Sequence, residues 1–131
     1  MPTRQENLAS IEEAFGFIPR WLDEMPDEVL DQYWKNHLWM CSDTALTLRE
    51  KALIAFGAAT AIHCNYRTPF HIAQLQLMGT TNEQLKEAAW LVQNVMGASA
   101  YLNGVRYDEE EFKDELDRLV EYLRSDQSVH P

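Results

Sequence analysis

The stretch from Ala52 to Ile62 constrains the fold most, because nearly every residue in it is apolar. It is rich in Ala and Gly and predicts a helix that is apolar all round and therefore buried on most sides. It is far shorter than the roughly 20 residues that span a bilayer. A chain of 131 residues has few other segments to cover such a helix, so we expect a second subunit to cover part of it.

The rest of the chain also predicts helices. No segment combines sustained alternation with β-branched enrichment, so we expect an all-α fold with no sheet. Thr47 with Glu50 three residues later is a capping box, and Thr68 followed by Pro69 predicts a helix that starts there. The expected helices are Glu6–Phe15, Pro26 to about Cys41, Thr47 to about Ile62, Thr68 through Gln76, Thr80 or Thr81 to Gly104, and about Glu109 to Arg124. The helix that ends at Gly104 is expected to bury a stripe of Leu85, Ala88, Ala89, Val92, Val95, Met96 and Ser99.

The length predicts a single domain over residues 1–131, and the charge pattern limits its partners. Eleven basic and 21 acidic residues give a net charge of −10, and −6 of it falls between Asp108 and Pro131, where we expect an acidic amphipathic C-terminal helix over about 109–124. Nucleic acids and anionic membranes need a basic surface, so neither is an expected partner. No N-terminal signal peptide is recognisable and two cysteines cannot form a disulfide scaffold, so we expect a soluble, cytoplasmic protein.

The segment from His63 to His71 carries the candidate chemistry. Cys64 lies after one predicted helix and before the N-terminus of the next, where the helix dipole stabilises a thiolate. Arg67 adds a positive charge nearby. If helical geometry continues through the turn, His71 lies on the same face as Cys64, because seven residues make about two turns. These are the components of an activated nucleophile, although a buried, inert cysteine with a hydrogen-bonded histidine is the alternative.

Three blocks of sequence resemble the carboxymuconolactone decarboxylase family, which includes alkylhydroperoxidases of the AhpD type. The first is the apolar helix with its start, Leu46 to Phe56; the second is Cys64-x-x-Arg67-x-x-x-His71; the third is Met78 to Ala88. The family pattern is an Ala-rich helix, a Cys-x-x-Cys-x-x-x-His motif and a Gly-Ala/Thr-Thr segment. The resemblance implies an AhpD-like helical domain with a core at about 46–104, assembled into homo-trimers or hexamers.

The chain departs from the redox members of that family at two positions. In those members the two motif cysteines form a reversible disulfide, and the histidine and an upstream glutamate relay protons. Here Cys64 matches the first cysteine and His71 the histidine, but Arg67 stands at the second cysteine. Ala52 stands at the glutamate position, and Glu50 is the nearest acid. The dithiol mechanism therefore does not carry over.

Three hypotheses follow. The first is a peroxidase-like thiol enzyme in which Cys64 attacks a peroxide or electrophile, His71 moves the proton and Arg67 lowers the thiol pKa. A thiol reductant or Cys41 would then resolve the oxidised cysteine, and Glu50 and Tyr66 are further auxiliary candidates. The second is a decarboxylase or lactone-type enzyme, in which Arg67 binds a small carboxylic acid and His71 is the acid or base. The third is a non-catalytic oligomeric protein that binds a ligand.

No cofactor or metal site is expected. His37 and Cys41 are four residues apart on one predicted helix, a spacing that suits a metal, and Cys64 and His71 would complete a set of four. Nothing in the sequence indicates that the two pairs converge, so core packing is the favoured interpretation.

Overall fold

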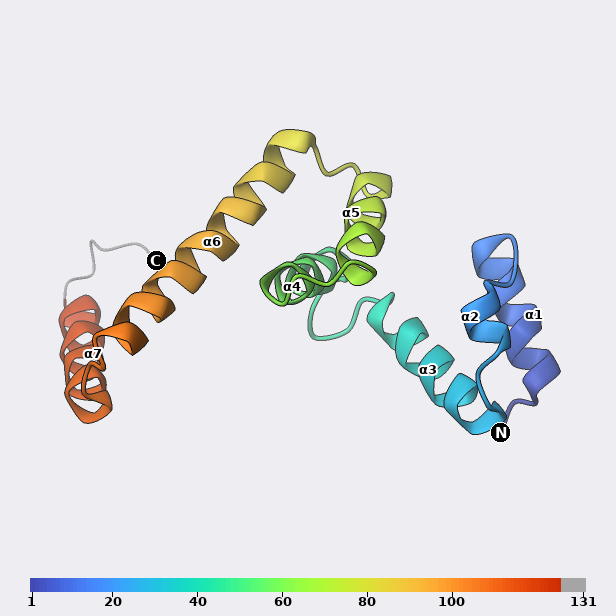
Figure 1. Ribbon diagram of the computed structural model, residues 1–131, viewed down its shortest axis with the longest axis horizontal. Helices are drawn as coiled ribbons and strands as arrows, with labels where there is room; N and C mark the ends of the chain where they lie inside the picture. The colour runs from blue at the N-terminus through green and yellow to red at the C-terminus, as the bar shows by residue number, and fades with distance from the viewer. Residues whose placement is uncertain (126–131) are drawn as a thin grey trace. The chain divides into compact units, whose positions relative to one another are not determined.

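The computed structural model describes residues 1–125, so residues 126–131 of the predicted domain lie outside it. The described part contains seven helices and no strand, which confirms the predicted all-α class (Figure 1). The helices are α1 (Arg4–Phe15), α2 (Arg20–Asp23), α3 (Asp27–Met40), α4 (Leu48–Ala61), α5 (Arg67–Leu77), α6 (Asn82–Gly104) and α7 (Glu109–Ser125).

Local interactions mark several of these helix ends. The Thr47 hydroxyl accepts the backbone N–H of Glu50, and the Glu50 carboxylate accepts the N–H of Thr47, so the predicted capping box of α4 is confirmed. Thr81 and Gln84 form the same reciprocal pair at the start of α6. At the C-terminal end of α1, Gly16 has a φ of 84°, a left-handed conformation that glycine adopts without steric cost.

The start of α5 differs from the prediction. Thr68 was expected to be the N-cap, but α5 begins at Arg67 and its N-cap residue is Tyr66, which makes no side-chain cap. The reason is that the Cys64 side chain takes the capping role: its Sγ accepts the backbone N–H of Arg67 at 3.3 Å. A free N–H of the first turn is thereby satisfied, and the N-cap residue lies two positions before the one that the Thr68-Pro69 pattern predicts.

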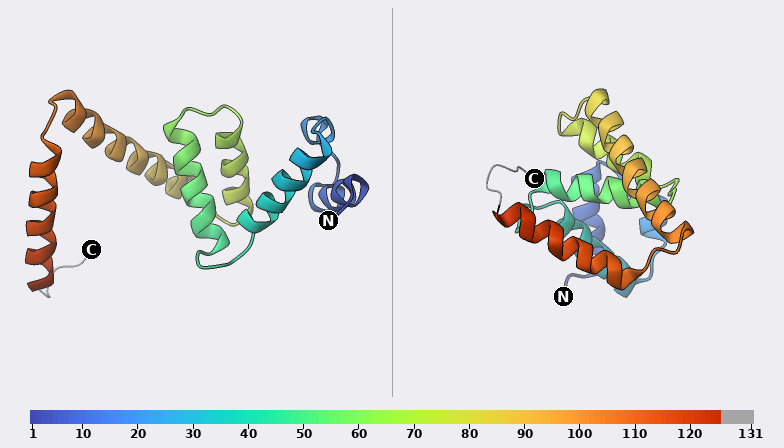
Figure 2. Two further views of the ribbon diagram at one scale, coloured as in Figure 1. Left: turned by 90° about the horizontal axis from the view of Figure 1, so that it is seen from below. Right: turned by 90° about the vertical axis from the view of Figure 1, so that its left-hand side faces the viewer.

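The chain divides into two compact units, residues 1–85 and residues from 86 onward. In the first unit α1 packs on α3, and α4 and α5 lie side by side (Figure 2). Ile11, Leu22, Leu30 and Trp34 form its fully buried apolar cluster. Asn7 donates a buried hydrogen bond to Asp31 at 3.0 Å, which joins α1 to α3. This unit positions the candidate chemistry, because it contains both cysteines and the histidines from His37 to His71.

The apolar helix α4 is only partly covered by its own unit. Ala52, Phe56 and Ala59 are buried against neighbouring helices. Ile54 is 59% exposed, and Ile62, which follows the last residue of α4, is 75% exposed. The expectation that a second subunit covers part of this helix stays a prediction.

The second unit consists of most of α6 together with α7. Within this unit taken by itself no residue of α6 or α7 is buried, so the buried stripe expected on α6 stays a prediction. Two helices joined by a short turn offer too little surface to cover each other's apolar faces. The α7 apolar face, which we define as Phe112, Leu116, Leu119 and Leu123, is exposed on one side of a helix whose remaining side chains are largely charged.

Candidate functional site

Cys64 lies in the turn between α4 and α5. The turn is sharp: His63 has a φ of 56°, an uncommon conformation for a residue other than glycine. The backbone N–H of Cys64 donates to the carbonyl of Ala59 at 3.0 Å, which holds the turn against the end of α4. The Cys64 thiol is thereby placed at the N-terminus of α5, the position that the sequence predicted for it.

The surroundings of Cys64 favour its thiolate form. Hydrogen bonds from the backbone N–H groups of Arg67 and then Tyr66 are the main reason that the pKa of the Cys64 thiol lies below its usual range. The charge of the Arg67 guanidinium lowers it further but contributes less than these amides. Cys64 lies in a hollow of about 320 Å³ that is open to solvent and is also lined by Thr60, His63, Asn65, Thr68 and Pro69.

His71 does not line the Cys64 hollow. It is buried on α5, where its Nδ1 lies 3.0 Å from Gln74 Oε1 and its ring packs edge-to-face on Phe70. The shared face was expected only if helical geometry continued from Cys64 to His71. The chain is not helical between Ala61 and Arg67, so Cys64 and His71 line two different cavities.

His71 instead lines a second cavity, which we call the α3–α5 cavity. It is enclosed by α3, α4 and α5 and has a volume of about 10 Å³, close to the space that one water molecule needs. Its lining residues are His37, Met40, Cys41, Lys51, Ala52, Ala55, Arg67, Phe70, His71 and Gln74. The structure therefore brings Cys41, and not Cys64, together with His71 and the Arg67 side chain.

A chain of polar contacts crosses this cavity. Cys41 Sγ lies 3.5 Å from His37 Nε2, and Gln74 Nε2 donates to the same sulfur at 3.9 Å. Gln74 in turn accepts from His71 through its Oε1. Because an amide nitrogen only donates and its oxygen only accepts, His71 carries its proton on Nδ1 in this arrangement.

The α3–α5 cavity has a positive electrostatic character. Arg67 and Lys51 line it, and no acidic side chain of the described chain does. Burial is the main cause that lowers the pKa of both His37 and His71, and the Arg67 charge lowers both further. Burial raises the pKa of the Cys41 thiol, while Arg67 and Lys51 oppose that change. At neutral pH this places neutral imidazoles next to a protonated thiol.

Arg67 contacts Cys64 through its backbone and the α3–α5 cavity through its side chain. Its backbone N–H donates to Cys64, whereas its guanidinium lies over the rings of Phe70 and Tyr33, at 4.9 and 5.9 Å from their centroids. Within residues 1–125 the guanidinium forms no ion pair with a carboxylate. Its charge is therefore available to the α3–α5 cavity.

The two remaining auxiliary candidates lie outside both cavities. Glu50 is exposed, and its hydrogen bonds with the backbone and hydroxyl of Thr47 lower its carboxyl pKa, which is the chemistry of a helix cap. The Tyr66 side chain is 85% exposed, although its backbone N–H contributes to the stabilisation of Cys64.

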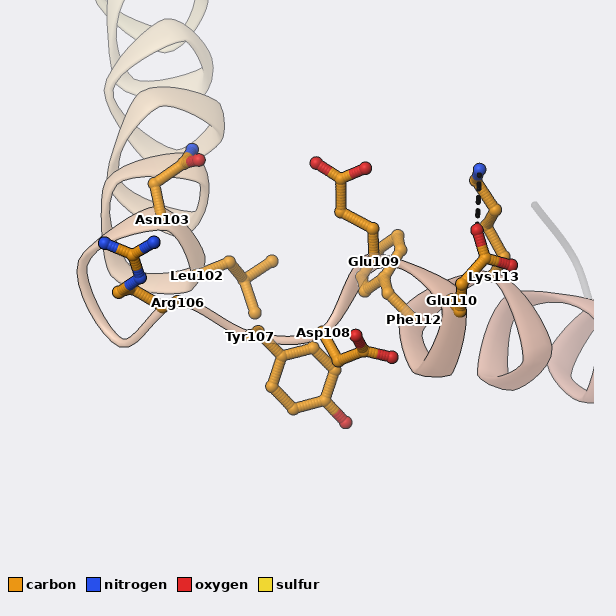
Figure 3. A pocket seen from close by; sticks show the side chains of 9 residues that line it. All are labelled: Leu102, Asn103, Arg106, Tyr107, Asp108, Glu109, Glu110, Phe112 and Lys113. Atoms are coloured by element: carbon orange, nitrogen blue, oxygen red, sulfur yellow. Dashed lines mark ion pairs between the residues drawn. The ribbon is translucent and has the colours of Figure 1, made fainter.

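A further hollow lies in the second unit. It has a volume of about 780 Å³ and lies at the turn between α6 and α7, where exposed side chains from Leu102 to Lys113 surround open space (Figure 3). Lys113 and Glu110 form an ion pair there at 3.6 Å. Neither cysteine nor histidine reaches it, so we assign it no chemistry. In the described part of the chain, no group of three or more His, Cys, Asp or Glu side chains is arranged to hold a metal ion.

Two residues that complete the α3–α5 cavity, Gln74 and Lys51, are not among the site residues predicted from the sequence. The signal for Gln74 was its position three residues after His71, which places both on one helix face. Lys51 is a charged residue at the start of the apolar helix, and nothing local indicates that it is buried. The spacing of His37 and Cys41 was noted, but their convergence with α5 depends on tertiary packing.

Comparison with known proteins identifies the family. The model of the carboxymuconolactone decarboxylase family matches residues 27–110, which is more than half of the chain. The chain belongs to the carboxymuconolactone decarboxylase family. This confirms the resemblance inferred from the motifs around Cys64 and His71.

One curated relative matches the chain over part of its length. "Uncharacterized protein 4 in cox locus" from Paracoccus denitrificans is 35% identical over 60 residues, which is 46% of this chain. The chain covers 54% of the length of that relative. No solved structure matches the chain significantly. None of the helices in the described residues of this family member is long and apolar enough to span a membrane.

The motif positions of the carboxymuconolactone decarboxylase family can now be located in space. The resemblance places Ala52 at the glutamate of the redox members, Arg67 at their second cysteine and His71 at their histidine. All three residues line the α3–α5 cavity. Cys41, the residue that follows the last residue of α3, lines the same cavity and lies outside the motif.

Proposed function

We propose that this carboxymuconolactone decarboxylase-family protein is a one-cysteine thiol enzyme in which Cys64 attacks hydroperoxides or similar electrophiles. The observation that carries the proposal is the hydrogen bond from the Arg67 backbone N–H to Cys64 Sγ at the N-terminus of α5. Such a donor stabilises a thiolate more than a thiol, because the negative sulfur is the stronger acceptor. The open hollow around Cys64 leaves room for an organic substrate.

The reaction balances with one thiolate and one hydroperoxide. Cys64 thiolate attacks the terminal oxygen of ROOH, the O–O bond breaks, and the alkoxide takes a proton from water to leave as ROH. The sulfur is oxidised by two electrons to a sulfenic acid. Two molecules of a small thiol then reduce it, releasing water and the disulfide of that thiol, because Cys64 and Cys41 line separate cavities.

The test is the pH dependence of Cys64 alkylation in a Cys41→Ala protein, where one thiol reports. We expect an apparent pKa clearly below the value of about 8.5 for free cysteine. Arg67→Ala serves as the matched variant: it removes the guanidinium but keeps the amide, so it should raise the pKa only slightly. An apparent pKa at or above that of free cysteine, in a protein with native circular dichroism, would refute the proposal.

We also propose a second copy of the chain as the partner that covers the exposed apolar surface. The α7 apolar face and the exposed Ile54 and Ile62 at α4 support this, since a single chain with so much exposed apolar surface gains free energy by association. A trimer or hexamer is the expected state from the family resemblance. Light scattering at micromolar concentration checks it, and a stable species of 15.2 kDa would contradict it.

A further inference from the structure

The C-terminal helix α7 lies almost entirely outside the part of the chain that the family comparison covers. The family model ends at residue 110, so all but the first two residues of α7 lie beyond it. The four side chains of the α7 apolar face are between 38% and 51% exposed. An exposed apolar face on a helix that is otherwise largely charged indicates a surface that another helix covers.

The spacing of the α7 apolar face is that of a two-helix coiled coil. Its members follow one another at intervals of four, three and four residues, the alternation of the a and d positions of a heptad. This spacing keeps all four side chains in one narrow stripe. Lys113 and Val120 flank the stripe on one side, and Glu115 and Tyr122 flank it on the other. A second helix with the same spacing fits such a stripe.

The charge of α7 is unequal along its length, and this selects the partner and its direction. Residues 108–117 contain seven acidic side chains and one basic one, whereas residues 118–125 contain two arginines and one glutamate. Two parallel copies of the helix would place their acidic halves side by side, where like charges repel. Two antiparallel copies place the acidic half of each beside the arginine-containing half of the other, and their helix dipoles then also oppose each other favourably.

We propose that the α7 apolar face pairs with the α7 apolar face of a second copy of this chain, in the antiparallel direction. In the register that aligns the two stripes, Leu116 of each copy lies level with Leu119 of the other, and Phe112 lies level with Leu123. The contact is two-fold symmetric, so it joins copies in pairs. This pairing rests on the self-association proposed above, and of the trimer and hexamer expected from the family resemblance it selects the hexamer.

The same register also matches opposite charges. Arg118 of each copy lies level with Asp117 of the other, and Arg124 lies level with Glu111. Exposed ion pairs contribute little free energy each, so these charges set the direction and register of the helices. The affinity of the pairing comes from burial of the apolar stripe.

The experiment cross-links neighbouring α7 helices in the full-length protein. Cys41→Ala and Cys64→Ala remove the native thiols, and one cysteine is introduced as Lys113→Cys in one protein and as Val120→Cys in a second. The two proteins are co-expressed and treated with a short bismaleimide, and mass spectrometry quantifies the cross-linked peptides. Antiparallel pairing brings position 113 of one copy close to position 120 of the other, whereas parallel pairing does not.

The matched control introduces the cysteines on the opposite face of the same helix. Asp114→Cys and Glu121→Cys have the same spacing as the test pair, but both positions lie about 170° from the centre of the apolar stripe, since successive helical residues are about 100° apart. We expect cross-links between positions 113 and 120 of different copies to be at least about tenfold more abundant than those between positions 114 and 121.

Truncation of the apolar stripe should abolish the preference. Leu116→Ala with Leu119→Ala should lower the yield of cross-links between positions 113 and 120 at least about tenfold, because four leucines in each pair of helices lose apolar surface. Asp114→Ala with Glu121→Ala, on the opposite face, should leave that yield unchanged. With both native cysteines present, the double leucine variant should have half the molar mass of the parent in light scattering at equal concentration.

Either of two outcomes would overturn the pairing. One is a yield between positions 113 and 120 no higher than that between positions 114 and 121, as expected if a different surface covers α7. The other is an unchanged molar mass in a double leucine variant with native circular dichroism, and this decides the matter if the protein without native cysteines does not fold. An oligomer without the cross-link refutes this pairing alone, whereas a monomeric parent also refutes the proposed self-association. The alkylation of Cys64 tests the proposed chemistry separately.

Discussion

Lys51, at the start of α4, donates hydrogen bonds to the chain at the C-terminal end of α3, next to Cys41. It is 8% exposed, and its Nζ donates to the carbonyls of Trp39 and Ser42 at 2.9 Å each. The same ammonium lies 3.9 Å from the centroid of the Trp39 ring. Replacing it by methionine keeps the length and apolar stem but removes all three polar contacts.

The expected loss of stability in Lys51→Met follows from these contacts. The Ser42 carbonyl loses a charged donor, worth about 1.5 kcal/mol or more. The Trp39 carbonyl still accepts from the Ser42 hydroxyl at 2.7 Å, so removing its hydrogen bond from Lys51 costs only about 1 kcal/mol of stability. The cation–π contact adds about 0.5 kcal/mol, because Trp39 is largely exposed. Burial of the methionine thioether recovers about 1 kcal/mol. Lys51→Met should therefore lower the free energy of unfolding by about 2 kcal/mol.

Urea unfolding followed by far-UV circular dichroism measures this change. Protein concentration is held fixed, because association would make the midpoint depend on it. Lys35→Met is the matched control, since Lys35 is exposed on α3 and its replacement should cost less than about 0.5 kcal/mol. A Lys51→Met protein as stable as the Lys35→Met protein would refute the role of Lys51.

Two further predictions concern α4 and the histidines. Thr47→Ala removes the capping hydroxyl of α4 and should lower the free energy of unfolding by about 1 kcal/mol in the same urea assay, whereas the exposed Thr44→Ala should change it little. The folded-state pKa values of His37 and His71 are lowered, so the unfolded chain binds protons first on acidification. Stability should therefore be complete above the unfolded pKa of about 6.5 and fall as the pH drops below it. A urea midpoint independent of pH between 7 and 5 would contradict this.

The helices could be predicted from the sequence wherever local interactions set their ends. Thr47 with Glu50 and Gly16 act within one turn of chain, so their patterns are sufficient. The predicted start of α5 was wrong because of one local contact: the Cys64 sulfur accepts the N–H of Arg67 and so caps the helix before Thr68. The burial expected for the α6 stripe stays a prediction, because an apolar stripe indicates a helix face that needs to be covered but not which surface covers it.

The candidate site, too, could be predicted from the sequence only in part. The lowered pKa of the Cys64 thiol could be predicted because the thiol, the turn and the next helix N-terminus are neighbours in sequence. The pairing of His71 with Cys64 was an extrapolation of helical geometry across residues 62–66, and the left-handed His63 interrupts it. The sequence by itself determined the helical class, the family and the thiol at the start of α5, all through short-range pattern. Only the tertiary structure decided that His71 and the Arg67 side chain face Cys41, because that cavity exists only where α3 packs against α4 and α5.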